Sequence, residues 1–206
     1  MGHGDSNGAF EEACIETRLS DIDAAASELL RLPGVNAVGL LGLRFGATLA
    51  AVAADRAPER YRDLILWEPV PRGSAYMQEL LRINLATQMA SYKEIRINRK
   101  EMAASMASGG LVNVDGYSLT GLLFQEASGI DLLEGKRPFL GKTLIVHLHR
   151  QAETMARPLE QLGTLYGDVT MAKVRVEPFW KEIKEYVPSC RPLFDTTSRW
   201  LQEETA

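Results

Sequence analysis

The chain has 206 residues, a length typical of one domain with a sizeable core. Its formal net charge of −4 argues against a general nucleic-acid-binding protein. Two cysteines far apart in sequence and three histidines without zinc-site spacing predict no metal site, no disulfide framework and no other cofactor. No apolar run reaches the ~18–20 residues of a membrane span, and no signal peptide is visible. We therefore expect one domain over residues 1–206 and a cytoplasmic location.

The chain opens on a Gly-rich segment with no strand before it. The residues from Gly2 to Ser6, Gly-His-Gly-Asp-Ser, resemble the G-H-G-x-S loop that follows the fourth strand of many α/β-hydrolases. By that interpretation the chain begins partway through the fold and lacks the strands upstream. The alternative is a flexible leader that includes tag or cloning residues.

A first helix is predicted to begin at Ser20, an N-cap residue with Asp23 three positions later. Pro33 and Gly34 are expected to end it. Between these limits one apolar face repeats at helical spacing, formed by Ile22, Ala25, Ala26, Leu29 and Leu30.

The segment from Val38 to Leu49 organises the rest of the chain. Its apolar start, Val38 to Leu41, predicts a strand covered on both faces, and the run from Ala47 to Ala54 predicts a helix. Between them, glycines stand two residues before and two residues after Arg44. Side chains at those two positions would crowd a strained strand-to-helix turn, as in the G-x-S-x-G nucleophile elbow of α/β-hydrolases.

Arg44 occupies the position where that chemistry needs a serine. A guanidinium stays protonated and has no acceptor, so it is no nucleophile at ordinary pH. At the N-terminus of a helix it can bind an anion, because backbone N–H groups and the helix dipole favour negative charge there. The candidate site is therefore the elbow itself: Gly42, Leu43, Arg44, Phe45 and Gly46. The alternative is a surface arginine on a Gly-rich turn.

A second strand is predicted from Asp63 to Pro69, which makes a parallel βαβ unit with the first. Residues 72–137 then form a mostly helical cap or insert. It comprises a helical stretch from Ala75 to Ser108, a short strand at 111–114 and a helix at 119–127. Five cations make the insert locally basic, which we interpret as a solvated helical face: Arg82, Lys93, Arg96, Arg99 and Lys100.

The core resumes with a third strand from Lys142 to His149 and a helix at 153–166, interrupted near Pro158. A fourth strand follows at 169–176, and a closing helix at 191–203. Together these elements predict an α/β fold with a parallel sheet of about four strands and helices on both faces.

The catalytic residues of a hydrolase are not recognisable at their expected positions. An acid is expected just past His149, where the chain offers Gln151 and Glu153. A histidine is expected just past the last strand, and no histidine follows His149. The positions there are Glu177, Phe179 and Trp180, and we expect the two aromatic side chains to fill the place of the imidazole. We interpret His147 and His149 as core or strand-end residues.

Four motifs occur in one order along the chain: Gly42-Leu-Arg-Phe-Gly46, Leu66-Trp-Glu-Pro-Val70, Asp115-Gly-Tyr-Ser-Leu119 and Glu177-Pro-Phe-Trp180. In this combination the sequence resembles the exosortase A system-associated hydrolases, bacterial proteins found beside exopolysaccharide export genes. The resemblance implies an α/β-hydrolase-like three-layer sandwich, truncated at its N-terminal side, and an esterase-like or acyl-hydrolase-like activity by descent.

Two functions remain open. One is a hydrolase-family protein without Ser–His–Asp catalysis. The other is a non-catalytic pseudoenzyme that binds an anion or a partner in a bacterial exopolysaccharide system. In a truncated sheet, the strand from Ala37 to Leu41 is an edge that lacks lysine, proline and inward charge. Such an edge pairs with another chain, is covered by the Met1–Arg18 segment, or aggregates. The partners that we expect are a small anionic ligand at the elbow and, unless that segment covers the edge, a second copy of the chain at the edge.

Overall fold

The computed structural model describes residues 2, 5–150, 154–180 and 189–203. The chain divides into two compact units. One combines Met1–Ala24 with Arg72–Asp131, and the other combines Ala25–Pro71 with Leu132–Ala206. The expected insert, 72–137, thus overlaps a unit that also contains the N-terminal segment. The expectation of a single domain stays a prediction.

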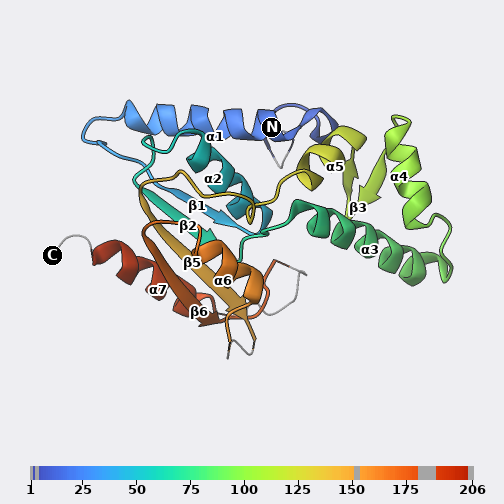
Figure 1. Ribbon diagram of the computed structural model, residues 1–206. Helices are drawn as coiled ribbons and strands as arrows, with labels where there is room; N and C mark the ends of the chain where they lie inside the picture. The colour runs from blue at the N-terminus through green and yellow to red at the C-terminus, as the bar shows by residue number, and fades with distance from the viewer. Residues whose placement is uncertain (1, 3–4, 151–153, 181–188, 204–206) are drawn as a thin grey trace. The chain divides into compact units, whose positions relative to one another are not determined.

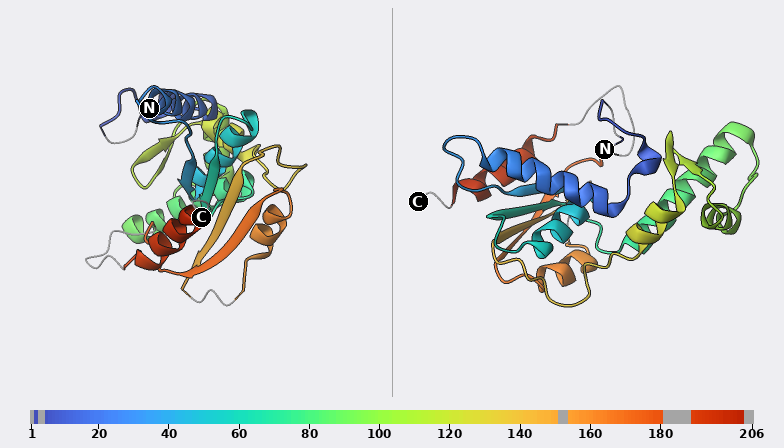
Figure 2. Two further views of the ribbon diagram at one scale, coloured as in Figure 1. Left: turned by 90° about the vertical axis from the view of Figure 1, so that its left-hand side faces the viewer. Right: turned by 90° about the horizontal axis from the view of Figure 1, so that it is seen from above.

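The second unit is built on a parallel sheet of four strands (Figure 1). Their order is β1 (Leu40–Leu43), β2 (Asp63–Trp67), β5 (Lys142–His149) and β6 (Val169–Arg175). Helices α2 (Phe45–Arg56) and α6 (Arg157–Gly163) lie on one face, and α7 (Arg191–Gln202) lies on the other (Figure 2). The predicted α/β sandwich with a truncated parallel sheet is therefore confirmed.

The α7 face of the sheet carries the main apolar cluster of this unit. Leu193 and Trp200 of α7 pack there against Ile65, Trp67, Leu144 and Val146 of the central strands. Two hydrogen bonds fix the helix to the sheet. Trp67 Nε1 donates to Thr197 Oγ1 at 3.1 Å, and Trp200 Nε1 donates to Thr170 Oγ1 at 3.0 Å.

Strand β1 is the edge of this sheet and differs from its neighbour in burial. Every residue of β2 is buried, whereas the Leu41 side chain of β1 is 51% exposed. The expectation that this strand is covered on both faces was wrong. Within the described part of the chain, β1 pairs with one strand, β2. The expected edge position is confirmed, with the strand beginning at Leu40 rather than Ala37.

Helix α1 (Ile15–Leu30) begins five residues before the predicted N-cap at Ser20. Its first turn is capped from elsewhere. Cys14 N donates to Thr17 Oγ1 at 2.9 Å, and Ile15 N donates to Glu126 Oε2 at 2.8 Å. Since the Glu126 carboxylate comes from a helix 111 residues later, local sequence did not reveal this start.

The first unit is mostly helical, with α3 (Gly73–Tyr92), α4 (Arg99–Ala107) and α5 (Gly121–Ser128) and a short 3-10 helix at Phe10–Glu12. It contains an antiparallel hairpin of β3 (Val112–Val114) and β4 (Tyr117–Leu119). The prediction that a helix begins at Leu119 was wrong. Asp115 and Gly116 both have positive φ, 49° and 91°, and this turn geometry returns the chain as a second strand.

Two further boundaries differ from prediction. The helical stretch expected through Ser108 is interrupted after Tyr92, because Lys93 adopts a left-handed conformation with φ 61°. The helix expected from residue 153 begins at Arg157, with Pro158 in its first turn, where a missing N–H costs nothing. Within the described part of the chain, no helix combines the length and apolar character needed to cross a membrane.

Candidate functional site

The turn between β1 and α2 places Arg44 at the carboxyl end of the sheet. Arg44 has φ 55° and ψ −122°, a conformation that L-residues rarely adopt. Its backbone is fixed on both sides. Arg44 N donates to Trp67 O at 2.9 Å, and Arg44 O accepts from Ala47 N and Thr48 N at 3.0 and 3.2 Å. The neighbouring strand and the first turn of α2 therefore hold the strained residue in place.

The two elbow glycines differ in what they contribute. A Cβ on Gly42 would lie 2.5 Å from the backbone N and Cα of Ala47, so β1 and α2 approach this closely only with glycine there. A Cβ on Gly46 would meet nothing within 4 Å, and Gly46 is exposed. The expectation of crowding on both sides of Arg44 was thus wrong for Gly46. The remaining elbow residues, Leu43 and Phe45, are half-buried.

Phe179 and Trp180 follow β6, and the Trp180 ring lies beside Arg44. The Arg44 guanidinium carbon lies 5.6 Å from the centre of the Trp180 ring, a cation–π distance. Phe179 packs edge-on against Trp180 with ring centres 5.3 Å apart, and both half-buried rings pack against the apolar cluster under α7. The expectation that the two rings fill the place of a catalytic imidazole stays a prediction, and the Trp180 ring lies beside the Arg44 guanidinium.

Trp180 differs from the other two tryptophans of the chain in its hydrogen bonding. The indole N–H groups of Trp67 and Trp200 donate to threonine hydroxyls. The Nε1–H of Trp180 is buried and finds no acceptor among the described residues. A buried donor without a partner costs free energy of roughly 1–3 kcal/mol, so this atom is one that a bound acceptor would satisfy.

A second strained residue, Glu68, stands beside Arg44 at the end of β2. Its φ is 45°, and its N donates to Val146 O at 2.7 Å. Its carboxylate Oε2 accepts from Leu148 N at 2.6 Å and lies 2.8 Å from His147 Nδ1. Glu68 thus joins β2 to β5 and orients the buried imidazole of His147.

The sequence did not predict the contact between Glu68 and His147, although both residues belong to segments that its motifs and strands singled out. The available signal was the position of each residue. Glu68 directly follows β2 and His147 lies near the end of β5, and parallel strands end at one edge of a sheet. His147 is buried, as expected for a core residue, whereas His149 is exposed and stacks on His147 with ring centres 5.9 Å apart.

Of the three remaining candidate residues, the structure describes Glu177. Glu177 is half-exposed at the end of β6, and its Oε2 pairs with Arg150 Nη2 at 3.0 Å. Gln151 and Glu153 lie outside the described residues. Among the residues that are described, no cluster of three or more His, Cys, Asp or Glu side chains could hold a metal ion.

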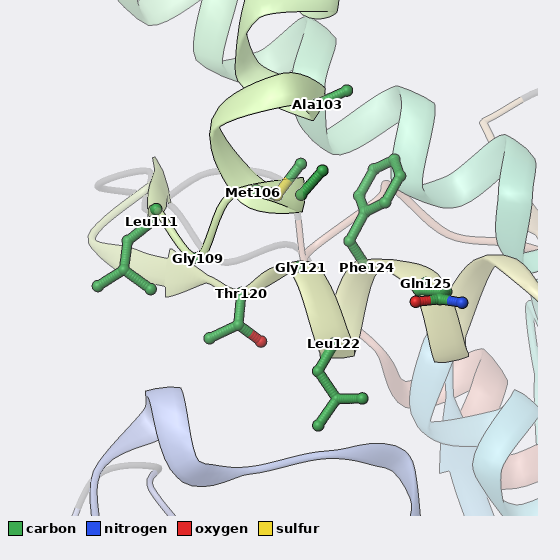
Figure 3. Close-up of a pocket in the computed structure, with 11 residues that line it drawn as sticks. Ala103, Met106, Gly109, Leu111, Thr120, Gly121, Leu122, Phe124 and Gln125 are labelled. Carbon is green, nitrogen blue, oxygen red and sulfur yellow. The ribbon is translucent and has the colours of Figure 1, made fainter.

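The other unit contains a cavity of about 630 Å³ between α4, the hairpin and α5 (Figure 3). Its lining is mainly apolar, including Met106, Leu111, Leu122 and Phe124. The Thr120 hydroxyl on its wall caps α5 by accepting from Leu123 N. No candidate residue from the sequence lines this cavity.

The sequence matches no protein-family model and no curated protein. Solved structures do resemble the fold. Mouse alpha/beta hydrolase domain-containing protein 10 superposes with a TM-score of 0.63 at 17% identity, over 100% of this chain and 76% of that one. Est1E from Butyrivibrio proteoclasticus, determined with bound ferulic acid, superposes with a TM-score of 0.58 at 20% identity, over 84% of this chain and 64% of Est1E.

The fold is that of the α/β-hydrolases. In α/β-hydrolases the nucleophile elbow is a strand-to-helix turn, and the assignment of the turn at Arg44 to that position stays a prediction. The chain spans less than two thirds of Est1E, so only part of that larger architecture is present in these residues. At 20% and 17% identity, the similarity to these structures establishes the fold alone. Activity and ligand are inferred from the residues of the site.

Proposed function

We propose that this α/β-hydrolase-fold protein binds an anionic group at its elbow and does not use Ser–His–Asp catalysis. The observation that carries the proposal is the strained Arg44 beside Trp180, whose buried N–H has no acceptor among the described residues. Two hydrogen-bond donors and no nucleophile stand where hydrolase chemistry would begin.

The chemistry of the elbow favours a carboxylate, a phosphate or an acidic sugar. Arg44 presents a planar guanidinium that can contact two oxygens of such a group at once. It does so at the N-terminus of α2, a helix of 12 residues whose dipole adds positive potential. The aromatic wall of Trp180 lowers the local dielectric, which strengthens a charged hydrogen bond.

The residues at the elbow and after β6 do not suit serine chemistry. Arginine has no lone pair available for attack on a carbonyl group. The segment after β6, where a base would be needed, carries Phe179 and Trp180 packed on the core. We infer that the esterase-like name implied by the resemblance reflects descent.

A residual hydrolytic activity is the second candidate, and the Glu68–His147 pair favours it. A carboxylate bound to Nδ1 orients an imidazole so that Nε2 can act as a base. In that case water, rather than a serine, is the nucleophile. His147 is only 8% exposed, which limits the access of a substrate and makes this the weaker candidate.

We also propose a cellular system, a location and a pairing partner for this protein. The four sequence motifs support a place in a bacterial exopolysaccharide system, where acidic sugars would be fitting ligands. A cytoplasmic location stays part of the proposal. The open edge of β1 supports pairing with a second copy of the chain, because its backbone groups on that side have no neighbouring strand among the described residues.

Titration calorimetry with phosphate, acetate and glucuronate tests the binding proposal. The wild-type chain should bind at least one of these anions, and Arg44→Ala should lose ~10-fold or more in affinity, the size of a charged hydrogen bond. Arg31→Ala, at an exposed arginine directly after α1, serves as the matched control and should bind as wild type. Equal affinity in Arg44→Ala would contradict the proposal.

An ester panel and a fluorophosphonate probe separate the two candidates. A binding protein should neither label with the probe nor hydrolyse the esters. Hydrolysis without labelling, lost in His147→Gln, would instead support water attack promoted by the Glu68–His147 pair.

A further inference from the structure

The connection between α3 and α4 is a basic loop, defined here as residues 92–100, which belongs to the mostly helical unit (Figure 1). Every residue in this loop is exposed. It carries four cations, Lys93, Arg96, Arg99 and Lys100, against one carboxylate, Glu94. Its formal charge is therefore +3 in a chain whose net charge is −4, so positive charge is concentrated at this place.

The basic loop also exposes large apolar side chains. Tyr92 and Ile95 are each 51% exposed, and Ile97 is 49% exposed, with Met89 adding a further exposed side chain from the last turns of α3. These four exposed apolar side chains lie within nine residues of the chain, and exposed apolar side chains that gather in this way are typical of an interaction surface. Here the apolar side chains alternate with cations in sequence.

The loop is held in this arrangement from beneath by a single buried amide. Gln88 is 8% exposed, and its Oε1 accepts from Arg96 N at 2.7 Å and from Ile97 N at 3.0 Å. Its Nε2 donates to Ile97 O at 2.9 Å and to Asn84 Oδ1 at 2.7 Å. These bonds fix the backbone on both sides of Arg96, so the two isoleucines project into solvent from a preorganised loop.

Both ends of the loop are fixed as well. Lys93 ends α3 in a left-handed conformation, with its N–H bonded to Met89 O at 3.1 Å. Asn98 begins α4 through a capping box with Glu101. The Arg96 guanidinium lies 3.7 Å above the Tyr92 ring, which covers one face of that ring with a cation.

We propose that this basic loop docks the protein on the surface of an anionic phospholipid bilayer. Isoleucine, methionine and tyrosine side chains at such a surface enter the boundary between headgroups and acyl chains, while lysines and arginines remain at the headgroups. Each cation near an anionic surface strengthens binding by about fivefold at low salt. The four cations and the apolar side chains together provide the two signals that reversible membrane binding requires.

A bilayer fits the loop better than other polyanions do. The chain's net charge of −4 disfavours general nucleic-acid binding. A bilayer surface takes the lysines and arginines at its headgroups and the isoleucines at its acyl chains within one short loop. The proposal is independent of the elbow, because all of its residues lie in the other unit.

Vesicle co-sedimentation of the full chain tests the proposal. Vesicles of phosphatidylcholine with about one-third phosphatidylglycerol should bind the protein, vesicles of phosphatidylcholine alone should bind it much less, and binding should weaken as salt rises from about 0.05 to about 0.5 M. Absence of binding at the lowest salt, or equal binding to both kinds of vesicle, would overturn the proposal.

Two variants separate the charged from the apolar contribution. Arg99→Glu/Lys100→Glu should lower partitioning by about 25-fold or more, and it should fold because acidic residues suit the first turn of α4. Ile95→Ser/Ile97→Ser should lower partitioning by about tenfold without changing charge. Circular dichroism checks that both variants are folded.

The controls distinguish this surface from the rest of the molecule. Lys136→Glu/Leu140→Ser removes an exposed cation and an exposed leucine outside the loop and should partition within about twofold of wild type. Arg44→Ala should bind vesicles normally, so failure of the elbow proposal leaves this one standing. Binding to polyglutamate that is equally strong, with the Ile95/Ile97 variant unaffected on vesicles, would overturn the bilayer in favour of an acidic protein.

Discussion

The two ends of the parallel sheet use charged side chains in opposite ways. At the carboxyl end, Arg44 and Glu68 are half-buried and both have positive φ, 55° and 45°. At the amino end, Asp55 and Arg137 form an ion pair with Nη1 2.8 Å from Oδ2, and both side chains are only 13% exposed. The proposed binding function rests on the strain and partial exposure at one end, whereas the enclosed ion pair at the other end indicates a structural role.

Burial has a measurable consequence at the amino end. It raises the pKa of Asp55 above its ordinary value, and the charge of Arg137 opposes that rise. The neighbouring Tyr166 is 6% exposed, and burial together with the Asp55 charge raises the pKa of its hydroxyl as well. At this end of the sheet, burial and the Arg137 charge thus act on the pKa of Asp55 in opposite directions.

The largest expected effect is that of Arg137→Leu, which leaves the Asp55 carboxylate without its partner. We expect the free energy of unfolding to fall by about 3–5 kcal/mol at pH 7.5, as when one partner of a buried ion pair is removed. Urea denaturation followed by circular dichroism measures this change. A loss under about 1 kcal/mol would contradict the structural role assigned to this end of the sheet.

The same variant has a predictable dependence on pH. A carboxyl group whose pKa is raised in the folded state takes up a proton on folding, so stability falls as pH rises from the ordinary pKa through the raised one. Without Arg137 the pKa of Asp55 rises further. The loss relative to wild type should therefore be smaller near pH 4 than at pH 7.5, and an equal loss at both would exclude the carboxylate as its cause.

Trp180→Ala tests the wall of the carboxyl end. A fully buried tryptophan costs about 3–5 kcal/mol on truncation, and Trp180 is half-buried on the apolar cluster, so we expect about 2–3 kcal/mol. Phe194 is 55% exposed on α7 and provides the matched aromatic control. Phe194→Ala should lower the free energy of unfolding by about 1 kcal/mol or less. If both variants lost the same stability, Trp180 would not be a core residue.

Arg44→Gly should separate the effect of Arg44 on the stability of the fold from its effect on anion binding. Glycine adopts φ 55° and ψ −122° without strain, whereas a side chain does not. We expect Arg44→Gly to gain about 1 kcal/mol in free energy of unfolding and to lose affinity for anions. Arg44→Ala, which keeps the strain, should lose the affinity without the gain. A less stable glycine variant would mean that the guanidinium contacts outweigh the strain.

Local pattern was enough to predict the sheet but not the contacts between its strands. Strand β5 was predicted with its observed bounds, because eight residues of unbroken strand pattern are independent of distant context. The Glu68–His147 bond joins residues 79 positions apart and follows from strand register, which one sequence does not specify. The predicted start of α1 was wrong for the same reason, because the carboxylate that caps this helix belongs to the distant residue Glu126.

The smallest effect on stability is expected at the edge strand of the sheet, β1, rather than at the carboxyl or amino end of the strands. Strand β1 has one neighbouring strand, and its sequence offers no lysine or proline to discourage pairing. Leu41 is 51% exposed on this strand, so Leu41→Lys should change the free energy of unfolding by less than about 0.5 kcal/mol. A lysine there should nevertheless prevent a second copy from adding its own β1, because two like charges would face each other across the pair.

Size-exclusion chromatography with light scattering decides whether the edge is used. Wild type should show a concentration-dependent dimer or larger species, and Leu41→Lys should shift it toward the monomer. The exposed leucine Leu140, 74% exposed and distant in sequence from β1, provides the control: Leu140→Lys should behave as wild type. A wild-type chain that stays monomeric at high concentration would contradict pairing through β1.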